Sequence, residues 1–237
     1  VVVFHYARSV LFNYTYNNTY WHIVNHFYKD KYYYGEFLPM KWQEYRNFTI
    51  NQIRNAQVCW EPYWHAILKD TYHPELLQLC YDNWPDMSVE SMSKNPINFN
   101  QNRLMYIPEQ GDRVFWNEFF ENILAHTDIQ QTIYTLEGLE YDQDRGINSS
   151  LWEDYSGYGV SNHVDGYTMN MAWHVYMYCD GGEKWGTSLN DEHGNEIKRF
   201  PFISNSSWLM RNDDRSWHSC DIIDCNLRQS VMARYMS

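Results

Sequence analysis

The spacing of hydrophobic and polar residues changes twice along the chain, near residue 48 and again after residue 126. Residues 1–49 contain short alternating pieces rich in Tyr, Asn and Trp, which predict strands or irregular segments packed through aromatic rings. Residues 49–70, 73–84 and 111–126 carry apolar side chains at helical intervals. The first half of the chain therefore predicts a layer of helices that follows an aromatic-rich segment.

Beyond residue 126 the hydrophobic period shifts toward two, which is typical of half-buried strands. Short runs of this kind are separated by Gly, Asn and Asp, and they occupy residues 130–141, 151–165, 168–180, 199–210 and 228–236. Strands at such spacing predict an antiparallel sandwich or barrel. We expect a mainly β fold with flanking helices, of the α+β class, in which residues 1–237 form a single domain.

Within that domain, residues 1–149 are expected to supply N-terminal strands and supporting helices, and residues 150–237 the part of the β structure that carries a site. Hydrophobic residues make up 44% of the chain and aromatic residues 18%, which is enough to build a core. The formal net charge of -12 would repel a phosphate backbone, so nucleic acid is not expected as a partner.

No apolar run approaches the length that spans a bilayer, so we expect no membrane partner. The five cysteines, Cys59, Cys80, Cys179, Cys220 and Cys225, form an odd set without a C-x-x-C pair. Reduced thiols and a cytoplasmic location are the prediction from that usage.

The strongest chemical signal is the triplet His163, Val164 and Asp165, which lies in a strand-like stretch. Because successive side chains of a strand point to opposite faces, the histidine and the aspartate share one face. A distant His218 completes a set of two imidazoles and one carboxylate. Such a set leaves the opposite side of a metal open, as in non-haem Fe(II) oxygenases. Two rival ligands, His174 in an aromatic strand and His193 in a polar turn, are expected to be structural or surface residues.

The ordered set of H-x-D, a distant histidine and then R-x-S resembles the Fe(II)- and 2-oxoglutarate-dependent oxygenases, particularly the prolyl-4-hydroxylase-like and phage-encoded members. The resemblance covers roughly residues 150–237. It implies a double-stranded β-helix, the jelly-roll or cupin-like architecture. It also implies that His163, Asp165 and His218 bind iron, and that Arg228 and Ser230 hold the distal carboxylate of 2-oxoglutarate (2OG). A guanidinium suits that task because it forms a two-pronged, charge-assisted pair with a carboxylate.

The activity implied by the resemblance is hydroxylation of a C–H bond with O2, coupled to decarboxylation of 2OG to succinate and supported by ascorbate. The substrate would be a small molecule or a peptidyl group. One alternative is a jelly-roll module that binds a glycan or peptide and performs no chemistry. Another is a cupin-like isomerase or dioxygenase that keeps the metal ligands and leaves Arg228 without a role.

Overall fold

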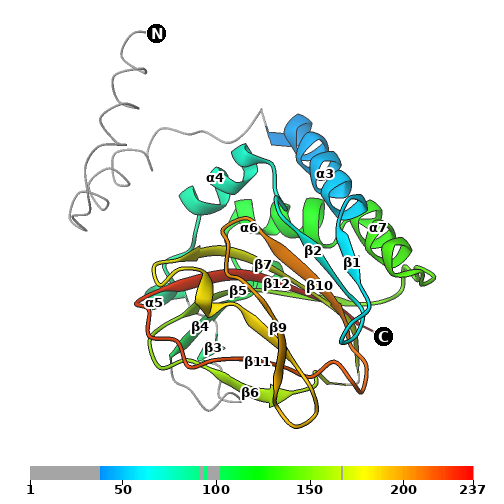
Figure 1. The fold of residues 1–237 in the computed structure, drawn as a ribbon. Coiled ribbons are helices and arrows are strands. Elements are labelled where there is room, and N and C mark those ends of the chain that lie inside the picture. The colour runs from blue at the N-terminus through cyan, green and yellow to red at the C-terminus, as the bar shows by residue number, and fades with distance from the viewer. Residues whose placement is uncertain (1–37, 91–92, 95–101, 167, 237) are drawn as a thin grey trace. The chain divides into compact units, whose positions relative to one another are not determined.

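In the computed structural model, the described residues are 38–90, 93–94, 102–166 and 168–236. The chain divides into two compact units, residues 1–40 and 41–237, and the described residues belong almost entirely to the second. Within the second unit the strands form one sheet of eight and one sheet of four, and every pairing between described strands is antiparallel (Figure 1).

The large sheet has the strand order β1-β2-β10-β7-β12-β5-β4-β3. Its strands are β1 (Gln57–Cys59), β2 (His65–Leu68), β10 (Ser207–Arg211), β7 (Met169–Cys179), β12 (Arg228–Met236), β5 (Ile147–Asp154), β4 (Arg103–Tyr106) and β3 (Ser93–Lys94). The small sheet has the order β6-β11-β8-β9. Its strands are β6 (Val160–His163), β11 (His218–Cys220), β8 (Thr187–Asn190) and β9 (Glu196–Phe200).

The helices lie on the side of the large sheet that faces away from the small sheet (Figure 1). They are α3 (Leu38–Arg54), α4 (Pro74–Asp82), α6 (Val114–Phe119), a π-helical continuation (Phe120–Leu124) and α7 (Thr127–Glu137); a short α5 (Met87–Glu90) leads toward β3. Alternation along β12 explains the layering. Tyr235 points to the helices, where its hydroxyl donates to the Leu124 carbonyl at 3.2 Å, whereas Met232 enters the core between the sheets.

Aromatic rings from both sheets fill the space between them. Phe200 of β9 stacks on Trp208 of β10 with ring centres 5.5 Å apart, and Phe202 stacks on Tyr176 of β7 at 4.2 Å. The Tyr176 hydroxyl donates to Thr187 Oγ1 on β8 and accepts from Trp208 Nε1, both at 2.9 Å. These contacts fix the inner face of the large sheet against the small sheet, and that face carries the candidate site.

The predicted fold class is confirmed, since strands fill most of the region from residue 147 to the C-terminus. The predicted helix at residues 73–84 corresponds to α4, and the one at 111–126 to α6 with its π-helical continuation. The division of one domain at residue 149 remains a prediction. Of the aromatic-rich segment, residues 1–37 lie outside the described part of the chain.

Three local predictions are wrong. Residues 38–49 belong to helix α3, and residues 57–68 form the hairpin of β1 and β2 instead of continuing a helix. Residues 130–141, which the hydrophobic period predicted as a strand, instead contribute residues 130–137 to helix α7 (Thr127–Glu137). There, His126 caps the first turn, Gly138 ends the helix in the left-handed region at φ 83°, and the buried side chains recur at helical spacing. Tertiary packing and caps outweighed strand propensity in this segment.

Candidate metal centre

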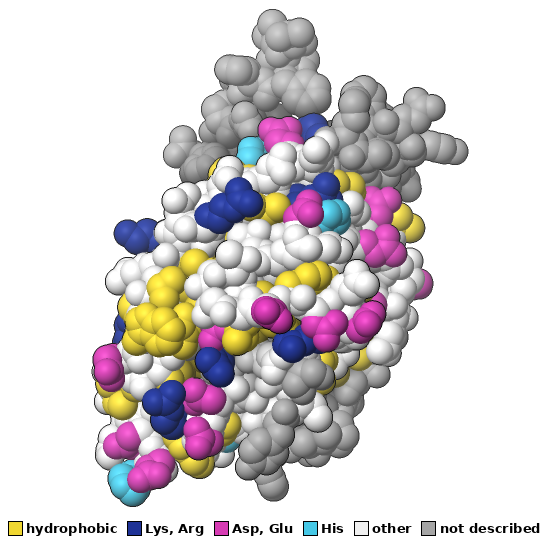
Figure 2. All heavy atoms as spheres, turned by 90° about the vertical axis from the view of Figure 1, so that its right-hand side faces the viewer, with side chains coloured by type: hydrophobic (Ala, Val, Ile, Leu, Met, Phe, Trp, Pro, Cys, Tyr) yellow, Lys and Arg dark blue, Asp and Glu magenta, His cyan; other side chains and the backbone are white. Residues whose placement is uncertain are grey.

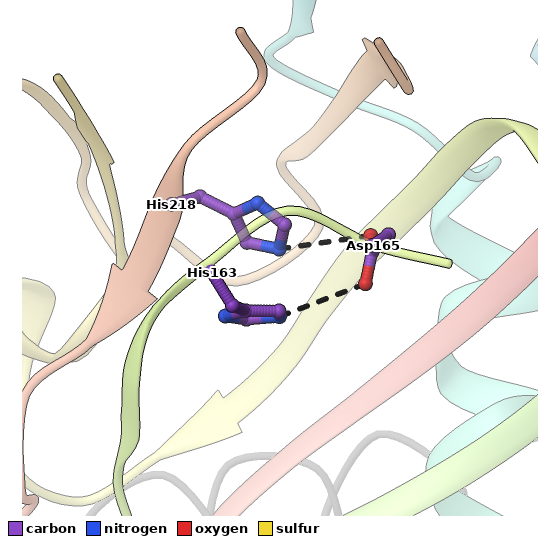
Figure 3. Close-up of side chains that lie close together, drawn as sticks. All are labelled: His163, Asp165 and His218. Atoms are coloured by element: carbon purple, nitrogen blue, oxygen red, sulfur yellow. Dashed lines mark ion pairs between the residues drawn. The ribbon is translucent and has the colours of Figure 1, made fainter. Parts of the chain in front are cut away.

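Two neighbouring strands of the small sheet bring the predicted metal ligands together (Figure 3). His163 ends β6 and His218 begins β11, and these two residues face each other in the antiparallel register. Asp165 follows β6 on the same side. Its Oδ1 lies 3.6 Å from His163 Nε2, and its Oδ2 lies 3.6 Å from His218 Nε2. These distances exceed a normal hydrogen bond and leave room for an ion between the three groups.

Each histidine ring is oriented by a backbone carbonyl. Nδ1 of His163 lies 2.9 Å from the Ser161 carbonyl, and Nδ1 of His218 lies 2.9 Å from the Ser216 carbonyl. A carbonyl can only accept, so Nδ1 carries the proton and the Nε2 lone pair is directed toward Asp165. Among the described residues, these three form the one group of His, Cys, Asp or Glu side chains whose ligand atoms fit around a metal, all within 4.8 Å.

The electrostatics of the cluster favour an ionised carboxylate. Burial raises the pKa of Asp165, but His163, His218 and Arg234 together lower it by more, so its pKa lies below the ordinary value. Burial lowers the pKa of His218, which keeps that ring neutral near pH 7. Burial also acts to lower the pKa of His163, but the Asp165 carboxylate and the Ser161 carbonyl outweigh it and the pKa is raised. A carboxylate and a neutral imidazole are the forms that bind a metal ion.

On the inner face of the large sheet, a buried ion triad joins three strands. Asp154 at the end of β5 accepts from Arg103 Nε and Nη2 of β4 and from Arg228 Nε and Nη2 of β12. The Nη2 contacts measure 2.9 Å and 2.7 Å. Burial raises the pKa of Asp154, but the two guanidinium groups lower it by more, and the group is ionised. Two cations therefore share one carboxylate, which leaves the enclosed triad with a surplus positive charge.

Arg228 also donates through Nη1 to the Trp185 carbonyl at 2.6 Å and to Cys220 Sγ at 2.8 Å. Cys220 lies two residues beyond His218 on β11, so this guanidinium reaches the strand that carries His218, a predicted metal ligand. The side chain is 2% exposed, and its orientation is fixed by protein groups.

A second guanidinium, that of Arg234, lies closer to the metal cluster and lowers the pKa of Asp165. The guanidinium carbons of Arg234 and Arg103 lie 5.0 Å and 3.7 Å from the centre of the Trp152 ring. Such cation–π contacts stabilise a partly or fully buried cation without neutralising its charge. Within the described residues, Arg234 forms no hydrogen bond or ion pair through its guanidinium, so it remains available to an anion.

Five buried polar groups on or beside the inner face of the large sheet have no hydrogen-bond partner among the described residues. They are the side-chain polar atoms of Ser150, Trp152, Tyr158, His174 and Ser230. Burial, followed by the nearby Arg228, Arg103 and Arg234, lowers the pKa of His174 well below its ordinary value, so that ring is neutral. Buried polar groups are normally paired, and a cluster of unpaired ones next to surplus positive charge suits a polar anion.

The structure thus brings the three predicted ligands together, leaves His193 exposed on a turn, and buries His174 in the core without making it a member of the cluster. Arg228 and Ser230 lie on the inner face of β12, but Arg228 is paired with Asp154, a contact that the sequence did not suggest. Strand alternation could have placed Trp152 with Asp154, and Arg234 with Arg228, because residues at even spacing share a face.

Tyr63, from the turn between β1 and β2, is another residue that the pattern did not reveal. Its hydroxyl donates to the Trp217 carbonyl at 2.7 Å, directly before His218. Burial, then the charges of Asp213 and Asp165, raises the pKa of Tyr63. The side chain is therefore a neutral donor that fixes the backbone next to His218, a predicted metal ligand.

The surface in Figure 2 mixes acidic, basic and uncharged side chains, and its described residues show no broad basic patch. Ion pairs at the surface include the exposed Lys184 with Asp224 and the partly exposed Arg199 with Asp221. No helix in the described ranges is both long and apolar enough to cross a bilayer. The predictions about nucleic-acid and membrane partners remain predictions.

No protein-family model matches the sequence, and no curated protein matches it. Solved structures do match the fold. A 2OG-Fe(II) oxygenase family oxidoreductase from Burkholderia pseudomallei is 12% identical with a TM-score of 0.53, over 73% of this chain and 84% of that one. A prolyl-4-hydroxylase from Pseudomonas putida is 10% identical with a TM-score of 0.55, over 80% and 97%. A viral collagen prolyl hydroxylase from Paramecium bursaria Chlorella virus-1 is 9% identical with a TM-score of 0.50, over 75% and 98%. This chain has the double-stranded β-helix fold of the 2OG-Fe(II) oxygenases.

Proposed function

We propose that this protein is an Fe(II)- and 2OG-dependent oxygenase. The observation that carries the proposal is the cluster of His163, Asp165 and His218, in which both Nε2 lone pairs and a carboxylate converge. Two imidazoles and one carboxylate on one side of an ion match the donor set of non-haem Fe(II) sites. These three side chains would hold the iron.

The charges on the inner face of the large sheet support the proposal that 2OG is the co-substrate. The triad of Arg103, Asp154 and Arg228 carries a surplus positive charge, and Arg234 adds a guanidinium with no ion-pair partner among the described residues. A dicarboxylate would neutralise this charge. Arg228 and Ser230 are the proposed partners of the distal carboxylate. Asp154 would hold the Arg228 guanidinium in place while the triad still attracts an anion, and the unpartnered Ser230 hydroxyl would donate to it.

When bound, the iron would supply oxidation of a C–H bond by O2 coupled to conversion of 2OG to succinate and CO2. The protein's own residues would orient the co-substrate and exclude water. The proposed product is a hydroxylated small molecule or peptidyl group. Two of the structural neighbours are named prolyl hydroxylases, which makes proline-containing peptides the first substrates to test.

The test measures Fe(II) and 2OG binding by calorimetry without oxygen, and succinate formation in air with ascorbate. His163→Ala should abolish iron binding, whereas His193→Ala, which removes an exposed histidine from a turn, should leave it unchanged. Arg228→Met should weaken 2OG binding at least tenfold, while Arg145→Met serves as the matched control. Absence of binding of both iron and 2OG to the folded wild-type protein would refute the proposal and favour a non-catalytic glycan- or peptide-binding module.

A further inference from the structure

Three of the five cysteines gather at one end of the small sheet. Cys220 and Cys225 belong to a buried apolar cluster with Tyr158 and Trp185, and the partly buried Cys179 packs against it. All of them are free thiols. Cys179 is the last residue of β7, and Cys225 lies in the segment 221–227 that joins β11 to β12. The sulfur atoms of Cys179 and Cys225 are 3.7 Å apart, which is direct contact.

The backbone holds these two cysteines next to each other. Asp180, directly after Cys179, accepts through its carboxylate from the backbone N–H groups of Asn226 and Leu227 and from the Asn226 side chain. The Asp180 backbone N–H donates to the Leu227 carbonyl at 3.2 Å. Cys179 also lies opposite Arg228 in the register of β7 and β12. The end of β7 is therefore tied to the segment that carries Cys225.

The third thiol of this region has a different environment. Cys220 Sγ contacts Arg228 Nη1 at 2.8 Å and donates to the Asp221 carbonyl at 3.5 Å. Cys59 lies on β1, where its sulfur contacts Lys198 of β9 at 3.6 Å. No contact between Cys59, Cys80 or Cys220 and another thiol occurs among the described residues, so contact between two sulfurs singles out Cys179 and Cys225.

We propose that Cys179 and Cys225 form a reversible dithiol–disulfide site. A disulfide has a sulfur–sulfur length of about 2.05 Å, so the two atoms must approach by about 1.6 Å, a movement within reach of side-chain rotation. The partner reagent is a low-molecular-weight disulfide of the glutathione class. The proposal does not depend on the oxygenase activity.

The exchange consumes one glutathione disulfide and releases two glutathione thiols. The sulfur of Cys179, the more exposed of the two, attacks one sulfur of glutathione disulfide and forms a mixed disulfide. The S–S bond of the reagent breaks, and one glutathione leaves with the proton lost by Cys179. Cys225 then attacks the Cys179 sulfur of the mixed disulfide, and the second glutathione leaves with the proton lost by Cys225. The protein loses two electrons to the reagent, and a dithiol reductant reverses both steps.

The environment of Cys225 sets the rate of the second step. Burial, followed by the adjacent Cys179, raises the pKa of Cys225 to about 12. Because the thiolate is the attacking form, ring closure should be slow at pH 7 and faster at pH 9.

The experiment treats the reduced full chain with glutathione disulfide at pH 7 and pH 9, alkylates the remaining thiols and maps the peptides by mass spectrometry. Wild type should lose two alkylatable thiols and yield a peptide that links Cys179 to Cys225, faster at pH 9. Cys225→Ser should stop at a glutathione adduct on Cys179, and Cys179→Ser should give no internal disulfide. Cys59→Ser, which changes a partly exposed thiol elsewhere, should behave like wild type.

A stability readout keeps the test independent of the chemistry of the variants. The linked wild-type protein should melt several degrees higher than the reduced protein, and dithiothreitol should remove the difference, because a disulfide restricts the unfolded chain. The proposal is overturned if folded wild type shows no link between Cys179 and Cys225 at pH 9. It is also overturned if Cys220 supplies one of the linked sulfurs.

Discussion

Replacing Asp154 by Asn should destabilise the protein more than removing either arginine that binds it. Arg103, Asp154 and Arg228 are 5%, 0% and 2% exposed, so their charges interact in an enclosed site. Two guanidinium groups and one carboxylate give a formal charge of +1 for the triad. Asp154→Asn raises this charge to +2, whereas Arg103→Met lowers it to 0.

The expected cost follows from this difference. Removing the one anion leaves two buried cations without compensation, a change of the kind that costs about 3 to 5 kcal/mol. Arg103→Met removes two charge-assisted hydrogen bonds but leaves a neutral pair, and it should cost about 1.5 to 3 kcal/mol. The double variant should be no less stable than Asp154→Asn alone, because Arg103 has no anion to lose once Asp154 is gone.

Urea denaturation followed by tryptophan fluorescence and circular dichroism measures these values, and coincident transitions establish that they compare two states. The pH dependence provides a second check. The pKa of Asp154 is lowered on folding, so its ionised carboxylate stabilises the folded state above the unfolded pKa of about 3.9. This stabilisation is lost as pH falls through the pKa of Asp154 in the folded state. Wild type should therefore lose stability in acid more steeply than Asp154→Asn. A cost below 1 kcal/mol for Asp154→Asn, or a larger cost for Arg103→Met, would refute the charge argument.

Three further substitutions test other parts of the structure. Burial raises the pKa of Glu137 despite the Arg211 ion pair, so the stability that this group gives the fold is present at low pH and is lost as pH rises through the pKa of the folded state. Glu137→Gln should therefore increase the free energy of unfolding by up to about 1 kcal/mol at pH 7 and leave it unchanged at pH 4, as measured by urea denaturation. Tyr63→Phe removes the donor to the Trp217 carbonyl, so it should lower the free energy of unfolding by about 1 kcal/mol and weaken metal binding measured by calorimetry. An unchanged metal affinity would exclude a positioning role for Tyr63. A side chain at Gly181 would lie within 2.6 Å of three neighbouring side-chain atoms, so Gly181→Ala should cost about 1 to 3 kcal/mol in the same denaturation assay.

The local sequence pattern was enough to predict which neighbouring residues of a strand share one face. The alternation of His163, Val164 and Asp165 placed two predicted ligands on one face, and the same rule put Arg228 and Ser230 together. The partners of these residues come from distant strands. Nothing near Arg228 in the sequence points to Asp154, because their contact arises only when β5 and β12 pair in this register.

The errors in secondary structure have a related cause. The segment 127–137 is rich in Thr, Ile and Tyr, which favour strands, but Ile129, Ile133 and Tyr134 find a buried surface only as one face of helix α7. Similarly, β1 and β2 are short and form a hairpin because β2 pairs with β10, a strand that lies far downstream. Local propensity cannot reveal partners that are remote in the chain.

The pairing of β6 with β11 has a consequence for the order of events in folding. Residues 164–217 separate His163 from His218, so the loop between them must close before both rings face Asp165. Contacts over such separations form slowly, because the chain loses loop-closure entropy before the contacts stabilise it. A metal ion that requires His163, Asp165 and His218 together would then find no site on the nascent chain, and it would bind to and stabilise the small sheet only after that sheet has formed. Bound metal should slow unfolding and leave the rate of folding nearly unchanged.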